Sequence, residues 1–168
     1  MLCDPMPVLS LYRYDKWFLI KKDKKESVPS TKQKGEQTEA IVLGEFKKRG
    51  LNVAIPFGDD HRYDFIVENS GNFYRVQCKT GRYREGTVRF PTRSIQPDAQ
   101  GYRKSDYEGE IDFFVIYVWE LEQTFLVPED EAAKNSMRLR GDPPENNQTK
   151  GVNWAKEFRL DSRIEAIT

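Results

Sequence analysis

The sequence is poor in the residues that build the most common metal and redox sites. It contains one histidine, His61, and two cysteines, Cys3 and Cys78. A metal cluster of several histidines is therefore excluded, and a Ser-His-Asp triad is disfavoured. Two cysteines are also too few for a disulfide framework or for the usual zinc sites.

Long apolar segments are also missing. The longest wholly apolar run, Phe113 to Trp119, has seven residues, whereas a membrane-spanning helix needs about 20. Asp4 and two early prolines interrupt the N-terminus, where a signal peptide would need a continuous apolar stretch. We therefore expect a cytoplasmic protein with no membrane partner. The 168 residues are enough for one domain with a tail.

The net charge is zero, but the charges are distributed unevenly. Residues 74–104 contain eight basic and two acidic residues, and residues 13–34 contain eight basic and three acidic ones. Residues 108–168 contain thirteen acidic and seven basic residues. Aromatic residues are interleaved with the arginines of residues 74–104, a combination that a phosphate backbone would attract. A solvated loop with scattered arginines would explain the charge pattern equally well.

The spacing of apolar residues predicts an α/β fold in which one helix precedes a mixed sheet. Val42, Leu43 and Phe46 recur at helical spacing within residues 35–49, and Gly50 closes the helix. Strands are expected at residues 53–55, 63–67, 73–79, 113–119 and 124–127, with a turn at 68–72 and a long basic connection before the fourth strand. Further along we expect a short helix at 129–134, a loop at 141–151 and a helical turn at 154–158. Residues 1–33 are predicted to be a basic N-terminal extension and residues 34–168 the folded domain.

Polar residues occur at positions where this pattern expects apolar ones. Glu39 lies three, four and seven residues before Val42, Leu43 and Phe46, so it should project from the helix face that packs on the sheet. Glu36 lies one turn earlier, near the edge of that face. A carboxylate in such a position needs a partner or a metal, because burying it alone is costly.

The predicted hairpin carries further polar groups. Asp64 lies in an otherwise apolar strand, and Gln77 and Lys79 share one face of the next strand while Val76 and Cys78 share the other. Strand pairing would bring the carboxylate, the amide and the amine together, with Glu39 approaching from the helix.

These groups are typical of a metal-dependent phosphodiesterase. Mg²⁺ prefers oxygen ligands, which Asp64, the Gln77 side-chain carbonyl and the backbone carbonyl of Cys78 could supply. Lys79 could orient or deprotonate the attacking water, or stabilise the charge that builds on the phosphate. Each residue alone has a simpler explanation, such as a solvated lysine or a Glu39–arginine pair. The combination with the basic stretch favours the metal site.

The chain resembles the PD-(D/E)XK nuclease superfamily in the succession Glu39, Asp64 and Gln77-Cys78-Lys79 and in the order of helix and hairpin. Residues 34–160 are most similar to the family of group I intron-associated homing endonucleases, and more distantly to archaeal-type Holliday junction resolvases. The resemblance is carried by Pro56-Phe57-Gly58-Asp59, Tyr63-Asp64, Phe73-Tyr74-Arg75-Val76-Gln77-Cys78-Lys79-Thr80-Gly81, Val88-Arg89-Phe90, Asp112-Phe113-Phe114 and Asn146-Asn147-Gln148.

The resemblance implies a restriction-endonuclease-like core and a Mg²⁺-dependent endonuclease that hydrolyses phosphodiester bonds in double-stranded DNA, with Mn²⁺ able to substitute. Glu39, Asp64, Gln77 and Cys78 would hold the metal, and Lys79 would be the catalytic lysine. Gln77 stands where most of the superfamily has an acidic residue, so we expect weaker metal affinity. Because cutting both strands needs two sites, a homodimer or homotetramer is expected.

The basic stretch should supply the contacts to DNA. The candidate DNA-binding residues are Arg75, Arg82, Arg84, Arg89 and Arg93. Three alternatives stay open: a Holliday-junction or structure-specific nuclease, a catalytically weak nucleic-acid-binding module of the same fold, and a structural protein whose buried polar residues form only a hydrogen-bonded network.

Overall fold

The computed structural model of the chain describes residues 29–58, 60–99, 101–142 and 151–167. It divides the chain into two units, residues 1–30 and residues 31–168, and the account that follows concerns the second unit. Nearly all of the predicted N-terminal extension lies outside the described residues. So do Asp59 and the string Asn146-Asn147-Gln148.

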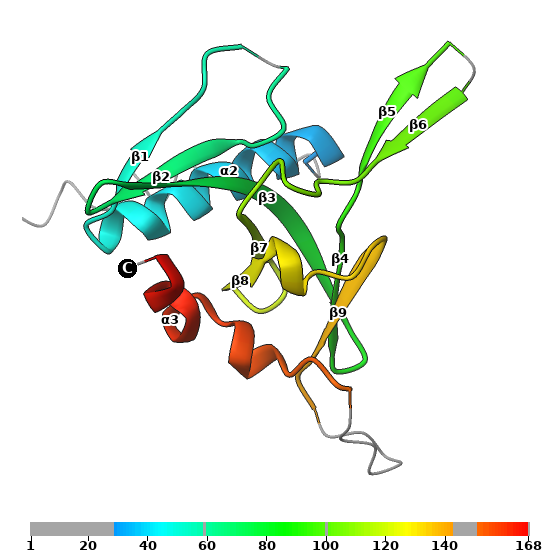
Figure 1. Cartoon of the computed structure of the whole chain (residues 1–168). Helices are drawn as coiled ribbons and strands as arrows, with labels where there is room; N and C mark the ends of the chain where they lie inside the picture. Colours follow the sequence, from blue (N-terminus) through cyan, green and yellow to red (C-terminus); the bar gives the residue numbers. More distant parts are fainter. Residues whose placement is uncertain (1–28, 59, 100, 143–150, 168) are drawn as a thin grey trace, which may run out of the picture. The chain divides into compact units, whose positions relative to one another are not determined.

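The first element of this unit is helix α2, Thr31–Lys48, which begins four residues before the predicted start. Its buried residues are Thr38, Val42 and Phe46. Leu43 is only half-buried, so the packing face lies to one side of the predicted one. The helix lies against one face of the sheet, where its main contacts are to the strands Asn52–Ala54, Asn72–Arg84 and Phe113–Val118 (Figure 1). None of the described helices is long and apolar enough to span a membrane.

Seven strands of the described residues form one sheet, in which β3 and β7 pair in parallel and the other pairs are antiparallel. They are β1 (Asn52–Ala54), β2 (Phe65–Asn69), β3 (Asn72–Arg84), β4 (Thr87–Pro91), β7 (Phe113–Val118), β8 (Gln123–Pro128) and β9 (Ser136–Arg140). The 13-residue β3 organises the sheet. Its first half pairs with β2, its middle with β7 and its last residues with β4.

Two further strands form an arm that projects away from this sheet (Figure 1). They are β5 (Ser94–Asp98) and β6 (Gly101–Ser105), and they pair only with each other within the described residues. The long connection predicted after the third strand is therefore wrong, because it contains β4, β5 and β6. Strand β9 was not predicted either. In β4 only Val88 and Phe90 are buried, and these two positions alternate with exposed ones, so the apolar signal is too short to stand out among the arginines.

The other predicted elements agree with the structure to within a few residues. The five predicted strands correspond to β1, β2, β3, β7 and β8. The short helix expected at residues 129–134 is a 3-10 turn at Glu129–Glu131, and the expected turn at 154–158 is a 3-10 helix at Ala155–Phe158. It is followed by α3 (Leu160–Arg163) and a 3-10 turn at Ile164–Ile167.

Apolar residues cover both faces of the middle of the sheet. On one face, Val76 and Cys78 of β3 pack against Val42 and Phe46 of α2. The opposite face packs against a second cluster that includes Tyr107 and the C-terminal Phe158. All six residues of β7 are buried, as the unbroken apolar run predicted. Strand β3 is therefore held from both sides where it carries the candidate site.

The turn between β2 and β3 sets the register of the candidate site. Ser70 and Gly71 both have positive φ, 52° and 84°, as in the two-residue turns that match the twist of a hairpin. This turn pairs Phe65 with Val76, so the residue before Phe65, Asp64, lies beside Gln77.

Candidate active site

The candidate site lies where no strand of the described residues pairs with one edge of β3. Pairing with β2 ends at Val76 and pairing with β4 begins at Arg82, whereas β7 pairs with the other edge throughout this interval. Asp64 fills part of the open edge. Its N–H donates to the Val76 carbonyl at 2.8 Å, and its Oδ2 accepts the Cys78 N–H at 2.5 Å. Asp64 therefore lies just before β2 rather than inside a strand, and its carboxylate replaces a strand partner.

The Gln77 amide completes the contacts of this carboxylate. Its Nε2 donates to Asp64 Oδ2 at 2.7 Å and to the Cys78 carbonyl at 3.3 Å. This orientation leaves Gln77 Oε1 available as an acceptor. The Asp64 carboxylate and the Cys78 backbone carbonyl thus both lie within hydrogen-bond distance of the Gln77 amide nitrogen.

Lys79 is positioned by a tyrosine that the sequence did not single out. Its Nζ donates to the Tyr107 hydroxyl at 2.7 Å and lies 4.7 Å from the centre of the Tyr107 ring. The Tyr107 side chain is only 4% exposed and packs edge-to-face on Phe114. The Arg62 guanidinium lies 4.4 Å from the same ring. Lys79 thus leaves β3 on the face opposite α2, toward the second apolar cluster.

Arg62 also ties the β5–β6 arm to the candidate site. Its guanidinium donates to Ser94 Oγ at 2.8 Å and to Ser105 Oγ at 3.1 Å, one residue on each strand of the arm. It also forms an ion pair with Glu110 and donates to the Asp106 carbonyl. Because Arg62 is two residues before Asp64, the base of the arm is fixed to the loop that carries the central carboxylate.

The predicted position of Glu39 needs correction. Glu39 and Glu36 are exposed, because the buried helix positions are Thr38 and Val42. Helical spacing had placed Glu39 in the packing face because it assumed that Leu43 was central. Gln77 and Lys79 also point away from α2, so Glu39 does not lie directly above them. It lies at the border of the helix face and interacts electrostatically with Asp64 and Lys79.

The two carboxyls at the site are both harder to ionise than usual. Burial raises the pKa of Asp64, although the Cys78 N–H and Lys79 partly offset this effect. Partial desolvation, followed by the nearby charges of Asp64 and Glu36, raises the pKa of Glu39. Burial also raises the pKa of the Cys78 thiol, which points toward α2. The thiol is therefore a poor ligand, and the backbone carbonyl of Cys78 is the better candidate.

The donor set fits a hard divalent cation. Among the described residues no group of three or more histidine, cysteine, aspartate and glutamate side chains gathers into a metal site. The candidate ligands are instead two carboxylates, Asp64 and Glu39, and the neutral oxygens of Gln77 and Cys78. Mg²⁺ commonly binds through one or two carboxylates and keeps several waters. A cation here would also relieve the two carboxylates whose pKa values are raised.

The structure separates the five predicted DNA-binding arginines. Arg82, Arg84 and Arg89 are exposed on neighbouring strands, β3 and β4. Arg75 instead forms an ion pair with Asp112, and its guanidinium also donates to the Gly109 carbonyl at 2.9 Å. Arg93 donates to the Lys134 carbonyl at 3.1 Å. Of the five, only Arg82, Arg84 and Arg89 lie together with side chains that make no hydrogen bond or ion pair to the described residues.

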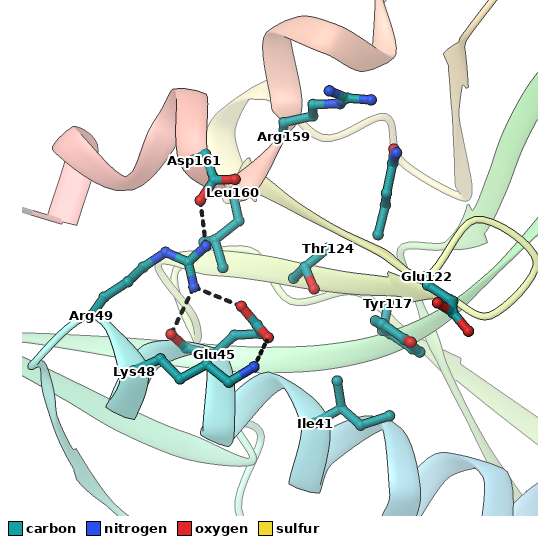
Figure 2. A pocket seen from close by; sticks show the side chains of 11 residues that line it. Ile41, Glu45, Lys48, Arg49, Tyr117, Glu122, Thr124, Arg159, Leu160 and Asp161 are labelled. Carbon is teal, nitrogen blue, oxygen red and sulfur yellow. Dashed lines mark hydrogen bonds and ion pairs between the residues drawn. The ribbon is translucent and has the colours of Figure 1, made fainter.

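A hollow of about 480 Å³ lies apart from these residues (Figure 2). It is bounded by α2, β8 and α3, and four of the charged side chains that line it form ion pairs with one another. Arg49 forms ion pairs with Glu45 and Asp161, and Lys48 forms one with Glu45. None of the candidate site residues lines this hollow.

Comparison with known proteins decides the family. The sequence model of the family described as PD-(D/E)XK endonuclease matches residues 29–161. The chain belongs to the PD-(D/E)XK endonuclease family. A solved structure titled as that of a bacterial homing endonuclease, I-Ssp6803I, is 26% identical in sequence, with a TM-score of 0.66, and the match covers 82% of this chain and 97% of that one. No curated protein sequence matches the chain.

The family assignment confirms three predictions from the sequence: the superfamily, the α/β fold with a helix before the sheet, and the endonuclease function. In this PD-(D/E)XK endonuclease, Asp64 and Gln77-Cys78-Lys79, which carry the predicted resemblance to the superfamily motif, lie around the open edge of β3. Tyr107 and Arg62 were missed, because nothing in their sequence context marks them as neighbours of Lys79.

Proposed function

We propose that the chain is a Mg²⁺-dependent endonuclease that hydrolyses phosphodiester bonds in double-stranded DNA, in the manner of a homing endonuclease. The observation that carries this proposal is the juxtaposition at the open edge of β3. Asp64 Oδ2 and the Cys78 carbonyl both accept hydrogen bonds from the Gln77 amide, and Lys79 follows two residues beyond Gln77 on the same strand.

Each residue has a distinct role in this proposal. Mg²⁺ or Mn²⁺ is held by Asp64, Gln77 Oε1 and the Cys78 carbonyl. Glu39 is a further ligand of the metal, either directly or through a water. The bound cation supplies Lewis-acid activation of the scissile phosphate and of a water. Lys79 orients that water and stabilises the negative charge that develops on the phosphate. Tyr107 holds the Lys79 ammonium and is a positioning residue.

The complete set of polar residues favours an active enzyme over a binding module that has lost its activity. Asp64 and Lys79 are both present and ordered by hydrogen bonds. We also propose that Arg75, Arg82, Arg84, Arg89 and Arg93 contribute to DNA binding, and that the chain works as a homodimer or homotetramer in the cytoplasm. The separate basic extension that we propose comprises residues 1–30, because the predicted boundary at residue 33 falls inside α2.

Incubation with supercoiled plasmid tests the function. With Mg²⁺ or Mn²⁺ the wild-type protein should nick or linearise the plasmid, and EDTA should stop the reaction. Asp64→Ala should abolish cleavage while duplex binding largely persists, because contacts to phosphates supply most of the affinity. Asp161→Ala, which removes an exposed carboxylate in the hollow beside α3, is the matched control and should cut normally.

Three results would contradict the proposal. Metal-dependent cutting by Asp64→Ala would show that the site is elsewhere. Duplex binding without cleavage in any divalent metal would favour the binding module. Cleavage of four-way junctions but not of plain duplexes would favour the structure-specific nuclease.

A further inference from the structure

A cluster of arginines occupies one face of the sheet beyond the N-terminal end of α2. The register places Arg82 of β3 opposite Arg89 of β4, and Arg89 opposite Arg138 of β9. Paired residues lie on the same face, and so do residues two apart on one strand. The arginine face therefore consists of Arg82, Arg84, Arg89, Arg138 and Arg140. The intervening residues of β4 and β9, such as Val88 and Leu139, are buried on the other face.

The arginines of this face differ from the structural arginines of the chain. Arg49, Arg62, Arg75 and Arg163 each form an ion pair with a carboxylate. Within the described residues, no side chain of the arginine face makes a hydrogen bond or an ion pair. Four of its members, Arg84, Arg89, Arg138 and Arg140, line a hollow of about 570 Å³.

This arrangement does not stabilise the isolated fold. Side chains directly opposite each other on antiparallel strands are about 4.5–5.5 Å apart at Cβ, and like charges in such pairs repel. Arg89 has an arginine opposite it on both sides, Arg82 and Arg138. A polyanion placed over the face would turn this repulsion into attraction, so the charge pattern fits a phosphate-rich partner.

The arginine face looks away from the candidate catalytic lysine. Side chains alternate along β3, so Arg82 and Lys79 project to opposite sides. Gly81 confirms the direction, because a Cβ at this position would meet Ile116 and Val118 at 2.8 Å, on the side of the second apolar cluster toward which Lys79 points. Phosphates bound by the arginine face are therefore not those being cleaved.

We propose that the arginine face binds the sugar-phosphate backbone of duplex DNA outside the cleaved segment, as a second contact that lengthens the footprint of the enzyme. This inference rests on the proposed function and adds Arg138 and Arg140 to the DNA-binding residues. The contact is to phosphates, so it adds affinity that is salt-dependent and independent of base sequence.

The double variant Arg89→Gln/Arg138→Gln tests the inference. Its affinity for a long duplex is measured against salt concentration and compared with that of wild type. Each lost phosphate contact should reduce the slope of log K against log salt by about 0.9, so the double variant should lose about two units of slope. The variant Lys47→Gln/Lys156→Gln removes two exposed lysines outside the face and should keep the wild-type slope.

Two further measurements separate binding from folding. A short duplex that fills only the cleavage site should bind wild type and Arg89→Gln/Arg138→Gln equally well, because it does not reach the arginine face. The charge-conserving variant Arg89→Lys/Arg138→Lys should keep most of the slope. Thermal unfolding of the glutamine variant should occur at the wild-type temperature or above it, because repulsion is relieved.

The outcomes distinguish this inference from the function on which it rests. If wild type binds and cleaves duplex DNA but the glutamine variant keeps the full slope, the arginine face is not a DNA contact and the proposed function stands. An equal loss of affinity on long and short duplexes would also overturn the inference. If wild type binds no duplex at all, both proposals fail.

Discussion

Asp64 both completes the backbone hydrogen bonding of β3 and supplies a charge to the candidate metal site. Its Oδ2 accepts the Cys78 N–H and the Gln77 amide, which fixes the side chain, and the other oxygen is left for a ligand. Burial raises the pKa of Asp64, so the ionised form carries a cost that a bound cation would remove. The metal-free protein should therefore gain stability when a divalent cation binds.

Replacing Gln77 with Glu tests whether this residue is a ligand. The change removes the donor to Asp64 and places two carboxylates side by side, so the metal-free protein should lose about 1–3 kcal/mol of unfolding free energy. The added charge should tighten Mg²⁺ binding, so the rise in melting temperature on adding Mg²⁺ should exceed that of wild type.

The control for this variant is Gln123→Glu, which adds the same charge at the hollow beside α3. It should show the wild-type response to Mg²⁺. If Gln77→Glu responded to Mg²⁺ no more than wild type, Gln77 would be a structural amide and not a ligand.

The sequence could predict the short-range part of the site but not the long-range part. The strand period of two places Gln77 and Lys79 on one face, and a hairpin turn places Asp64 beside them. Tyr107 lies 28 residues after Lys79 and Arg62 reaches over 30 residues to the arm, so these contacts depend on how the strands pack. The error for Glu39 came from a shift of the helix face toward Thr38, which hydrogen-bonds to Thr80 of β3.

At the scale of elements, long apolar patterns were predicted and short ones were not. The strand at Phe113–Val118 is an unbroken apolar run, and the helix carries Val42, Leu43 and Phe46 at helical spacing, so both stand out in the sequence. Strands β4 and β9 each bury two side chains, and the positions between them carry arginines, which are also common in loops. Pairing with β3 and with each other, rather than local preference, makes them strands.

The β5–β6 arm depends on Arg62 for its position. Arg62→Ala removes contacts to Ser94, Ser105 and Glu110 and should cost roughly 1–3 kcal/mol of stability. Amide hydrogen exchange should rise in residues 94–98 and 101–105, because the base of the arm is released. The single-turnover cleavage rate should also fall, because Tyr107 loses its cation partner on one side and holds Lys79 less firmly.

Arg163→Ala is the matched control for the arm, because Arg163 forms a similar ion pair with Glu131 far from it in the sequence. This variant should lose stability without faster exchange in the arm. Unchanged exchange of the arm in Arg62→Ala would show that another contact holds it.

At the scale of the whole molecule, acidic and basic residues are equal in number, but the arginines fall into two groups with different surroundings. Arg49, Arg62, Arg75 and Arg163 are neutralised by carboxylates, whereas the side chains of the arginine face form no ion pair within the part of the chain that the structure describes. The Asp64 carboxylate lies at the open edge of β3, where a bound cation would offset its repulsion of an anionic substrate. Binding and cleavage are thus assigned to different sides of one strand, and variants should affect them separately.

The most direct test of the nuclease account is single-turnover cleavage of a labelled duplex by Lys79→Ala at saturating enzyme concentration and in Mg²⁺. The account predicts that the rate falls by roughly two to four orders of magnitude, the usual effect of removing a positioned acid–base or electrostatic group. The rise in melting temperature on adding Mg²⁺ should persist, because an ammonium is not a metal ligand. Cleavage within about threefold of the wild-type rate would contradict the account, because a general acid–base or electrostatic group should contribute far more, and Lys79 would then be only a solvated strand residue.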